Sequence, residues 1–307
     1  MAANNVSREN ESIAQGCSYL PPLATDHEKI ALVSIYALIM MIAIPGNLII
    51  IVTILKSQRL RENVTFVFVL SVSIADFLVA SLAETFALST IALSNQNSVI
   101  CDAAFTTGFA SAGASITGVI GITLERFLFI VHPFTHDKIM TKKRVCCIIL
   151  VLWCVGLSPG VMFLFGFNPK LIQGIAVGNY FVTFIISITA NSKFLTMAME
   201  KMRKDEKEGN MPSGVKSIRK RQIQTTLLIL KICVVFAVCW LPYGVLGLVI
   251  AANKIKKTSK TVFTLYYWSV PLGYSNSALN VFIYGMGNTV LSEEVKKILK
   301  CNKSGRF

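Results

Sequence analysis

The stretch that decides the fold is Ser115-Ile-Thr-Gly-Val-Ile-Gly-Ile-Thr-Leu-Glu-Arg-Phe127, where a long uncharged run stops at an acid–arginine pair. The run begins near Ala103, so it is long enough for a helix to cross a hydrocarbon layer of about 30 Å. Helices in the core of a soluble protein are shorter and carry a charged stripe, which this run lacks. The pattern therefore predicts a membrane-spanning helix that ends at Glu125 and Arg126.

Six further apolar runs have the same character, and only one of them carries acidic side chains, Asp76 and Glu84. Hydrophobic residues make up 53% of the chain and charged residues 15%, which favours a protein embedded in lipid. Each backbone polar group in lipid must be satisfied within its own segment, so the runs are predicted to form an all-α bundle of seven helices. The predicted spans are Ile30–Leu55, Val64–Leu93, Ala103–Leu124, Val145–Phe167, Leu171–Ser192, Ile232–Ala252 and Thr261–Val290.

The runs divide the chain into an N-terminal arm (1–29), a seven-helix transmembrane domain (30–287), and an amphipathic segment with a tail (288–307). The arm has no apolar stretch typical of a cleavable signal peptide, so the first span is expected to direct its own insertion. Apolar and charged residues alternate over Asn288–Lys300, which predicts a helix lying on the inner leaflet. Cys301 at its end is a candidate for palmitoylation, with an unmodified thiol as the alternative.

The distribution of basic residues predicts the orientation. Most of the 30 Lys and Arg residues fall in the loops after the first, third and fifth spans and in the C-terminal tail. Short basic loops remain in the cytosol, so we expect a multi-pass plasma-membrane protein with its N-terminus outside. Asn5 and Asn10 then lie in extracellular glycosylation motifs. The basic residues are interleaved with spans, which favours contact with anionic membrane lipids and argues against nucleic-acid binding.

Several polar side chains are predicted to lie at membrane depth, where they are costly and often functional. Asp76 lies near the middle of the second span with no Lys or Arg at its depth, so its charge needs a proton or a cation as partner. Hydroxyl, amide and carboxylate oxygens suit a hard cation, so the set predicts a site for Na⁺ or a proton. The alternative is a hydrogen-bonded network that joins helices without an ion. The predicted polar set is Asn47, Asp76, Ser115, Asn276, Ser277 and Asn280.

These residues also carry a resemblance, because the chain is similar to class A (rhodopsin-like) G-protein-coupled receptors. The matching segments are Gly46-Asn47, Leu70–Asp76, Cys101 at 25 residues before Arg126, Trp153, Cys239–Pro242 and Asn276–Tyr284. The resemblance implies an allosteric sodium pocket formed by Asp76, Ser115, Trp240, Asn276, Ser277 and Asn280. It also implies that Arg126 meets a heterotrimeric G protein when the sixth helix swings outward.

The residues of the sixth span fit such a switch. Pro242 removes a backbone hydrogen bond inside the helix and predicts a kink about which one half can move. Trp240 lies two residues earlier as a bulky lever below the outer cavity. The predicted coupling and switch residues are Glu125, Arg126, Trp240, Pro242, Asn280 and Tyr284.

Other positions depart from the family pattern. The loop before the fifth span has no cysteine, so Cys101 is expected to be free or to pair with Cys17. This short loop, and a fifth span without proline, resemble the melanocortin branch and its relatives among the lipid receptors. Val281 replaces a usual proline in the seventh span. Gln222 stands where many relatives have an acid that holds Arg126, which suggests a weak inactive-state clamp.

The resemblance also predicts an outer ligand cavity. Tyr274 stands in place of the lysine that binds retinal in opsins, and Gly108 in place of the aspartate of amine receptors, so both subfamilies are disfavoured. An apolar, roomy cavity favours an extracellular ligand that is apolar or amphipathic. The alternative is that its small residues serve close helix packing. The predicted lining residues are Glu84, Phe86, Gly108, Phe109, Ala112, Tyr243, Gly247, Val270 and Tyr274.

The sequence therefore predicts a receptor that binds a ligand from outside and activates a G protein. A receptor that signals without ligand is an alternative favoured by Gln222. A seven-span transporter is a weaker one, because neither internal repeats nor broken helices are visible. No enzyme is expected, since His27, His132 and His136 lie in loops without a paired nucleophile. No cofactor is expected beyond the sodium ion.

Overall fold

The computed structural model describes residues 25–92, 98–131, 135–207, 213–251 and 260–303, and these residues are almost entirely helical. The elements, in chain order, are α3 (Asp26–Lys56), α4 (Gln58–Arg61), α5 (Val64–Leu78), the π-helical turn η1 (Val79–Ala83), α6 (Glu84–Ala92), α7 (Ser98–Val131), α8 (His136–Ile139), α9 (Lys142–Leu164), α10 (Pro169–Lys207), α11 (Ser213–Ala251), α12 (Lys260–Gly287) and α13 (Thr289–Lys303).

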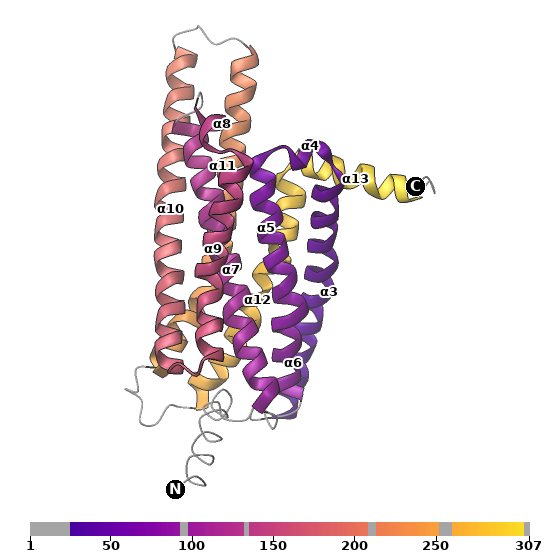
Figure 1. Cartoon of the computed structure of the whole chain (residues 1–307), viewed down its shortest axis with the longest axis vertical. Coiled ribbons are helices and arrows are strands. Elements are labelled where there is room, and N and C mark those ends of the chain that lie inside the picture. The colour runs from indigo at the N-terminus through magenta and orange to yellow at the C-terminus, as the bar shows by residue number, and fades with distance from the viewer. Residues whose placement is uncertain (1–24, 93–97, 132–134, 208–212, 252–259, 304–307) are drawn as a thin grey trace.

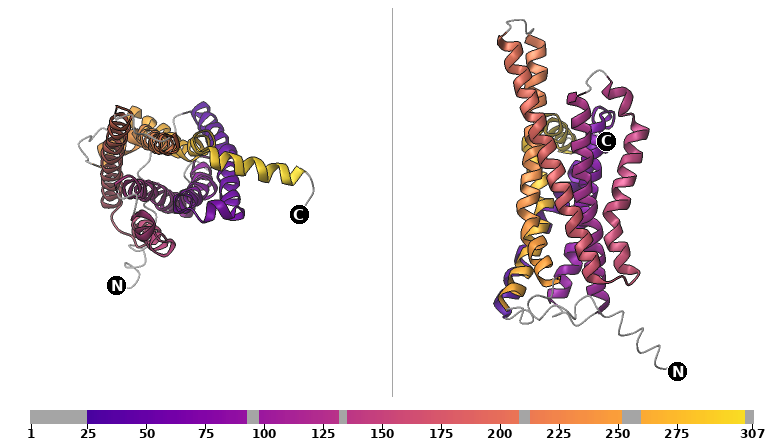
Figure 2. Two further views of the ribbon diagram at one scale, coloured as in Figure 1. Left: turned by 90° about the horizontal axis from the view of Figure 1, so that it is seen from above. Right: turned by 90° about the vertical axis from the view of Figure 1, so that its left-hand side faces the viewer.

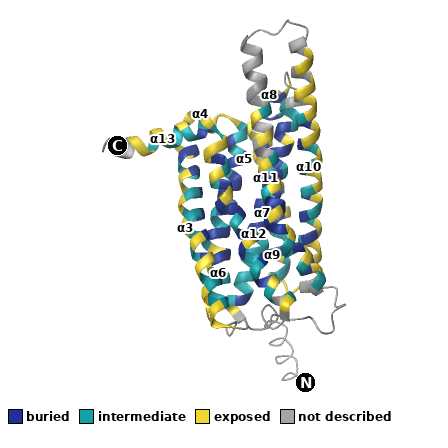
Figure 3. Ribbon diagram, turned by 180° about the vertical axis from the view of Figure 1, so that it is seen from behind, coloured by how far each residue is buried: buried dark blue, intermediate teal, exposed yellow. Residues whose placement is uncertain are grey.

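The long helices stand side by side and form a ring when the molecule is seen from above (Figures 1 and 2). Helix α7 runs through the middle of the bundle and packs against α5, α6, α9, α10 and α11. Its buried face is continuous, whereas α3, α9 and α10 present wide apolar faces outward (Figure 3). An exterior rich in exposed Leu, Ile and Val is what a lipid environment requires.

Six helical segments, counted over the described residues, are long and apolar enough to cross a membrane. The seventh span is α12, which lies in the bundle beside α3 and α11. Its mean hydropathy is lowered by the hydroxyl and amide side chains that it buries. These are Ser269, Asn276, Ser277 and Asn280. The predicted all-α bundle of seven helices is confirmed.

Several predicted ends differ from the observed ends. Helix α7 extends from Ser98 to Val131, beyond both ends of the apolar run. Helix α10 continues to Lys207 and α11 begins at Ser213, so both project beyond the bundle (Figure 1). The prediction counted apolar residues only. Residues such as Lys, Met and Glu favour helix as strongly as Leu does, so these helices continue past the apolar run.

The second predicted span is interrupted by the turn η1, which begins at Val79 and ends at Ala83. A π-helical turn holds one residue more than an α-helical turn, so the residues after it are rotated by about 100° about the helix axis. Glu84 is the first residue after this turn, and its side chain is fully buried. The span predicted over Val64–Leu93 is thus one continuous helical segment from Val64 to Ala92 that contains this wider turn.

Asparagine caps start two helices at the end of the bundle that carries Arg126, here called the arginine end. The Asn63 side chain accepts a hydrogen bond from the Thr65 amide at 3.0 Å and starts α5. Asn288 does the same for Leu291 at 3.1 Å, and α13 then leaves the bundle sideways (Figure 2). The predicted amphipathic helix therefore exists, one residue after its expected start. Cys301 lies inside it, but its side chain is outside the described part.

Val281 fills the place of the missing proline in α12. A side-chain carbon added to Gly46 on α3 would lie 2.6 Å from a Val281 methyl carbon, so glycine is required for the two helices to meet here. The branched side chain therefore packs α12 onto α3. Pro271, ten residues earlier, is the proline that the helix does contain.

Candidate functional site

The Asp76 carboxylate lies at the centre of a buried polar cluster. Its side chain is fully buried and accepts three hydrogen bonds from two other helices. Ser115 on α7 donates at 2.7 Å, and Ser277 and Asn280 on α12 donate at 3.2 and 2.8 Å. The sequence-predicted partners thus meet in space, and they join α5, α7 and α12 through one charged group.

Asn276 lies in the same buried layer but does not bond to Asp76. Its Oδ1 atom has no hydrogen-bond partner in the described part of the chain, and the same holds for Oδ1 of Asn280. Asn47 on α3 donates to the backbone carbonyl of Ser277 at 3.1 Å and so fixes α12 beside the carboxylate. Carboxylate, hydroxyl and free amide oxygens are ligands suited to a hard cation such as Na⁺. Among the described residues no group of three His, Cys, Asp or Glu could hold a transition metal.

A second polar cluster surrounds Arg126 at the arginine end. The Arg126 guanidinium donates to the Glu125 carboxylate from Nε at 2.5 Å and from a terminal nitrogen at 3.0 Å. The same guanidinium bonds to the Thr65 hydroxyl on α5, and that hydroxyl lies 3.1 Å from Glu125. Glu125 is 1% exposed and Arg126 8%, so the ion pair is shielded from water. The predicted acid–arginine pair is intact, with Thr65 as an additional partner.

His136 in α8 completes this cluster. Its Nε2 atom lies 3.3 Å from Glu125 Oε1, a separation that makes an ion pair although its direction does not meet hydrogen-bond geometry. Its Nδ1 atom lies 2.9 Å from the Asp137 carboxylate. The Glu125 carboxylate raises the pKa of His136 above its ordinary value of 6.5, with Asp137 adding to this and burial opposing it. The sequence placed His136 in a loop, whereas it begins the short helix α8 and contacts two carboxylates.

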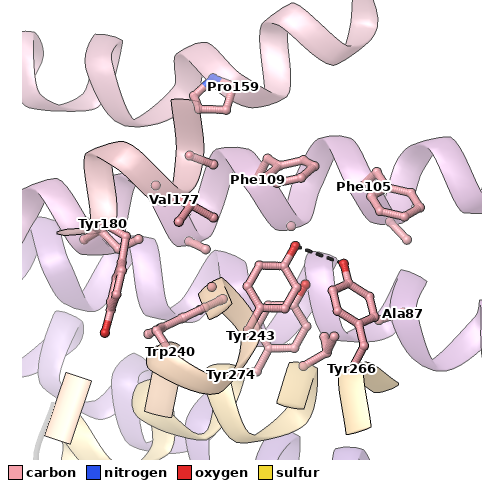
Figure 4. A pocket seen from close by; sticks show the side chains of 18 of the residues that line it. Ala87, Phe105, Phe109, Pro159, Val177, Tyr180, Trp240, Tyr243, Tyr266 and Tyr274 are labelled. Atoms are coloured by element: carbon pink, nitrogen blue, oxygen red, sulfur yellow. Dashed lines mark hydrogen bonds between the residues drawn. The ribbon is translucent and has the colours of Figure 1, made fainter. Parts of the chain in front are cut away.

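The opposite end of the bundle, here called the cavity end, contains a space of about 130 Å³ that is partly open to solvent. Its walls come from α3, α6, α7, α9, α10, α11 and α12, and they are mainly aromatic and aliphatic. Figure 4 shows the rings of Tyr243, Tyr266 and Tyr274 side by side, facing Phe105 and Phe109 of α7. The Tyr266 hydroxyl donates to the Tyr243 hydroxyl at 3.3 Å.

Six of the nine residues predicted for this cavity line it: Gly108, Phe109, Ala112, Tyr243, Val270 and Tyr274. Gly247 instead packs against the Gln173 side chain, which occupies the space that a larger residue would need. Phe86 is half-buried on α6 and outside the lining. Glu84 is fully buried and is not among the lining residues, which on α6 lie farther along the same face.

Trp240 connects the cavity to the layer below it. Its ring contacts Tyr274 at 5.8 Å and Tyr243 at 5.7 Å between centroids, both edge to face, and Phe236 at 6.3 Å. Pro242 lies inside α11 two residues later. Tyr284, deeper in α12, is 2% exposed, and its hydroxyl has no partner among the described side chains. Of the predicted switch residues, Pro242 is half-buried, and the others are buried.

Cys101 at the start of α7 is disulfide-bonded, so the alternative of a free thiol is wrong. Its predicted partner, Cys17, lies outside the described residues, as do the glycosylation motifs at Asn5 and Asn10. The side chains of Gln222 and Thr226 at the base of α11 are also outside the described set.

Sequence reasoning missed three residues that make polar contacts between helices. Thr65 and His136 contact Glu125, and Asn191 on α10 bonds to Thr123 on α7 at 3.2 Å. Asn191 is fully buried in an apolar span, so the cost of a buried amide could have identified it. Nothing in the sequence distinguishes Thr65 or His136 from other loop and helix-end residues.

Comparison with known proteins agrees with this geometry. The model of the 7 transmembrane receptor (rhodopsin family) matches residues 46–174 and 168–284. The chain belongs to this family. It is a G-protein-coupled receptor, and its relatives are receptors and not enzymes, as the sequence predicted.

The similar proteins are melatonin receptors and a melanin-concentrating hormone receptor. The melatonin receptor type 1A of Mus musculus is 26% identical over 274 residues, covering 83% of this chain and 76% of the relative. The melanin-concentrating hormone receptor 1 of Rattus norvegicus is 26% identical over 315 residues, covering 97% and 88%. The melatonin receptor type 1B of Homo sapiens is 25% identical over 279 residues, covering 83% and 74%. The loop features resemble a different branch, so sequence and matches agree at the level of the family.

Proposed function

We propose that this receptor binds its ligand in the aromatic space at the cavity end and transmits binding through Trp240 to Arg126. The observation that carries the proposal is that Trp240 lines that space and contacts Tyr274, whose helix α12 also carries the buried Asn280 and Tyr284. A displaced Trp240 ring must move against Tyr274 and Tyr243, which themselves line the cavity. A ligand can therefore change the equilibrium between receptor states by packing differently against these rings.

The lining favours a ligand with a large apolar part. Its side chains are aromatic and aliphatic, and the polar groups among them are mainly tyrosine hydroxyls. A compact apolar or amphipathic molecule fits this surface better than a highly charged one. The relatives are named as receptors for melatonin and for melanin-concentrating hormone, which does not identify the ligand of this chain.

We further propose the orientation, with the N-terminal arm and the cavity outside and the arginine end in the cytosol of a cell with this protein in its plasma membrane. The basic loops on the arginine side support it. Asn5 and Asn10 would then carry glycans, and α13 would lie on the inner leaflet with Cys301 available for acylation. Glycosidase treatment should increase the mobility of the expressed protein. An unchanged mobility, with proteolysis of 208–212 from outside intact cells, would reverse the orientation.

The Asp76 cluster is proposed as the sodium site. The free Oδ1 atoms of Asn276 and Asn280 beside a carboxylate support it, and no basic side chain neutralises Asp76 in the described bundle. Such an ion would join α5, α7 and α12 and stabilise the inactive state. Ligand-independent signalling is the second candidate, and its support is the sequence of α11, where Gln222 replaces an acid.

Nucleotide exchange by a panel of G proteins tests the function directly. Membranes that contain the chain should accelerate exchange by at least one G-protein class after addition of serum lipid or peptide extracts. Arg126→Ala should reduce this stimulation at equal surface expression. Ala112→Phe, which fills the cavity, should reduce the response to the extract and leave basal exchange intact. Stimulation that is unchanged in Ala112→Phe would place the ligand elsewhere.

A further inference from the structure

Glu84 differs from the other buried carboxylates of the bundle. Asp76 accepts three hydrogen bonds, and Glu125 is bonded to Arg126 and Thr65. Glu84 is fully buried, and neither of its carboxylate oxygens has a hydrogen-bond partner within the described residues. A carboxylate buried without a partner is costly, and a positive group brought to it removes that cost. The described residues give Glu84 no such partner, so a positively charged group from a ligand can stabilise it.

The position of Glu84 relates it to the cavity. Ala87 and Ile91 lie three and seven residues later on α6, so they share its face, and both line the space. Tyr36 and Tyr274 also line the space, and their hydroxyls are within electrostatic range of Glu84. Their rings meet edge to face with centroids 6.2 Å apart. Glu84 thus lies one helical turn deeper than the cavity wall, behind these two rings.

The wall itself is suited to an organic cation. Its tyrosines present aromatic faces, which attract ammonium groups, and no Lys, Arg or His is among the lining residues that the structure describes. A single carboxylate with phenol groups is a poor site for a metal ion, which needs more oxygen ligands. The tyrosines of the lining are Tyr36, Tyr180, Tyr243, Tyr266, Tyr267 and Tyr274.

We propose that the ligand carries a primary ammonium group, which passes between Tyr36 and Tyr274 to pair with Glu84 while its apolar part fills the aromatic cavity. The inference rests on the proposed function and adds the chemical class of the ligand. Gly108 argued against an amine, because α7 lacks a carboxylate there. The structure shows the Tyr274 hydroxyl in that place, only 2.8 Å from where a side-chain carbon on Gly108 would lie. The negative charge comes instead from α6.

Three small probes of equal shape test the class. Phenylpropylamine, phenylpropanol and phenylpropanoate differ only in a positive, neutral or negative end group. The full chain is purified into lipid nanodiscs, and its thermal unfolding midpoint is measured with each probe at millimolar concentration, since molecules of this size bind weakly. The amine should raise the midpoint by a few degrees more than the alcohol, and the acid should have the smallest effect.

Variants identify the group responsible. Glu84→Gln should abolish the advantage of the amine over the alcohol, and Glu84→Asp should reduce it. Thr85→Ala is the matched control, because its side chain is the next one along α6 and is exposed on the outer surface. It should keep the full advantage. If Glu84→Gln does not fold, Glu84→Asp with the same three probes provides the test.

Equal shifts from amine and alcohol in the wild type, an absence of any shift, or an amine advantage that survives Glu84→Gln overturns the assignment. A shift of equal size from calcium chloride alone, lost in Glu84→Gln, also overturns it in favour of a metal site. Basal nucleotide exchange on the same preparation separates the two proposals. Exchange without amine selectivity rejects the ligand class alone, whereas amine selectivity without exchange by any G protein rejects the proposed function alone.

Discussion

The hydroxyl of Thr65 on α5 lies 3.1 Å from the Glu125 carboxylate on α7 and also bonds to the neighbouring arginine. The helix that carries Asp76 in its interior therefore also holds the acid–arginine pair at its end. Both polar clusters restrain α5 against α7, and a change in either must be accommodated by the same two helices.

Replacing Thr65 with valine should raise basal nucleotide exchange several-fold. Valine keeps the volume but removes the hydroxyl, and a hydrogen bond to a charged group contributes about 1.5–3 kcal/mol. Part of this is recovered from water, because Thr65 is only half-buried. Thr189→Val is the control, since Thr189 is exposed and bonds to carbonyls of its own helix. Exchange by Thr65→Val equal to that of the control would show that Thr65 does not restrain Arg126.

Sodium should lower basal exchange, and Ser115→Ala should weaken this effect. Ser115 donates to Asp76, so its loss removes an oxygen from the proposed ion site. Ser111 lies one turn away on the same helix and bonds only to the Thr107 carbonyl, which makes Ser111→Ala a matched control. Exchange is measured with sodium or an organic cation of equal ionic strength. A wild type indifferent to sodium would leave the hydrogen-bonded network without an ion as the better description.

Gln222→Glu should lower basal exchange at unchanged surface expression. An added carboxylate at the base of α11 offers Arg126 a bond across the bundle, and about 1–3 kcal/mol shifts a two-state equilibrium roughly tenfold or more. Gln222→Met keeps the size without charge and serves as the comparison. Wild-type membranes that are silent, together with no effect of the glutamate, would remove the argument for ligand-independent signalling.

The stability of α8 should depend on pH through His136. The folded-state pKa is raised above 6.5, so the stabilising contact with Glu125 is fully present below about pH 6.5 and is lost as the pH rises through the folded-state value. Hydrogen exchange of residues 136–139, corrected for intrinsic pH effects, should show less protection at high pH. His136→Phe should remove this dependence while keeping the edge contact to Phe129. Protection that varies with pH equally in both proteins would contradict the assignment.

Cys17→Ser should lower the unfolding free energy of the receptor by about 2–4 kcal/mol, the usual contribution of a disulfide. Cys101 is disulfide-bonded, and Cys17 is the partner that the sequence predicts. Peptide mapping without reduction should recover both cysteines in one fragment. Recovery of Cys17 as a free thiol would show that another cysteine is the partner.

The bundle and the Asp76 cluster were predictable because each depends on regular features. Long apolar runs directly predict membrane spans. Within these spans, the distance from the helix end predicts the depth of Asp76, Ser115 and Asn280. Contacts of Thr65 and His136 were not predictable, since they depend on how α5 and α8 meet α7 in space. The ends of α10 and α11 were predicted wrongly, because a helix can continue beyond the apolar run that crosses the lipid.

Glu84 shows the same limit in another way. The sequence identified Glu84 as the one acid in its half of the span. The direction of its side chain depends on the turn η1, which comes directly before it. The sequence predicted that Glu84 lines the cavity, whereas the structure buries its side chain outside the lining.

The turn η1 also affects how this chain should be compared with its relatives. Residues counted from Asp76 correspond to those of a relative only as far as Val79. After Val79, the wider turn acts like a one-residue insertion in the helix. Beyond it, an alignment without a gap matches inward-facing residues of one receptor to lipid-facing residues of another. Binding contacts assigned to α6 by residue number from a melatonin receptor would therefore fall on the wrong side chains, unless both helices widen at the same place.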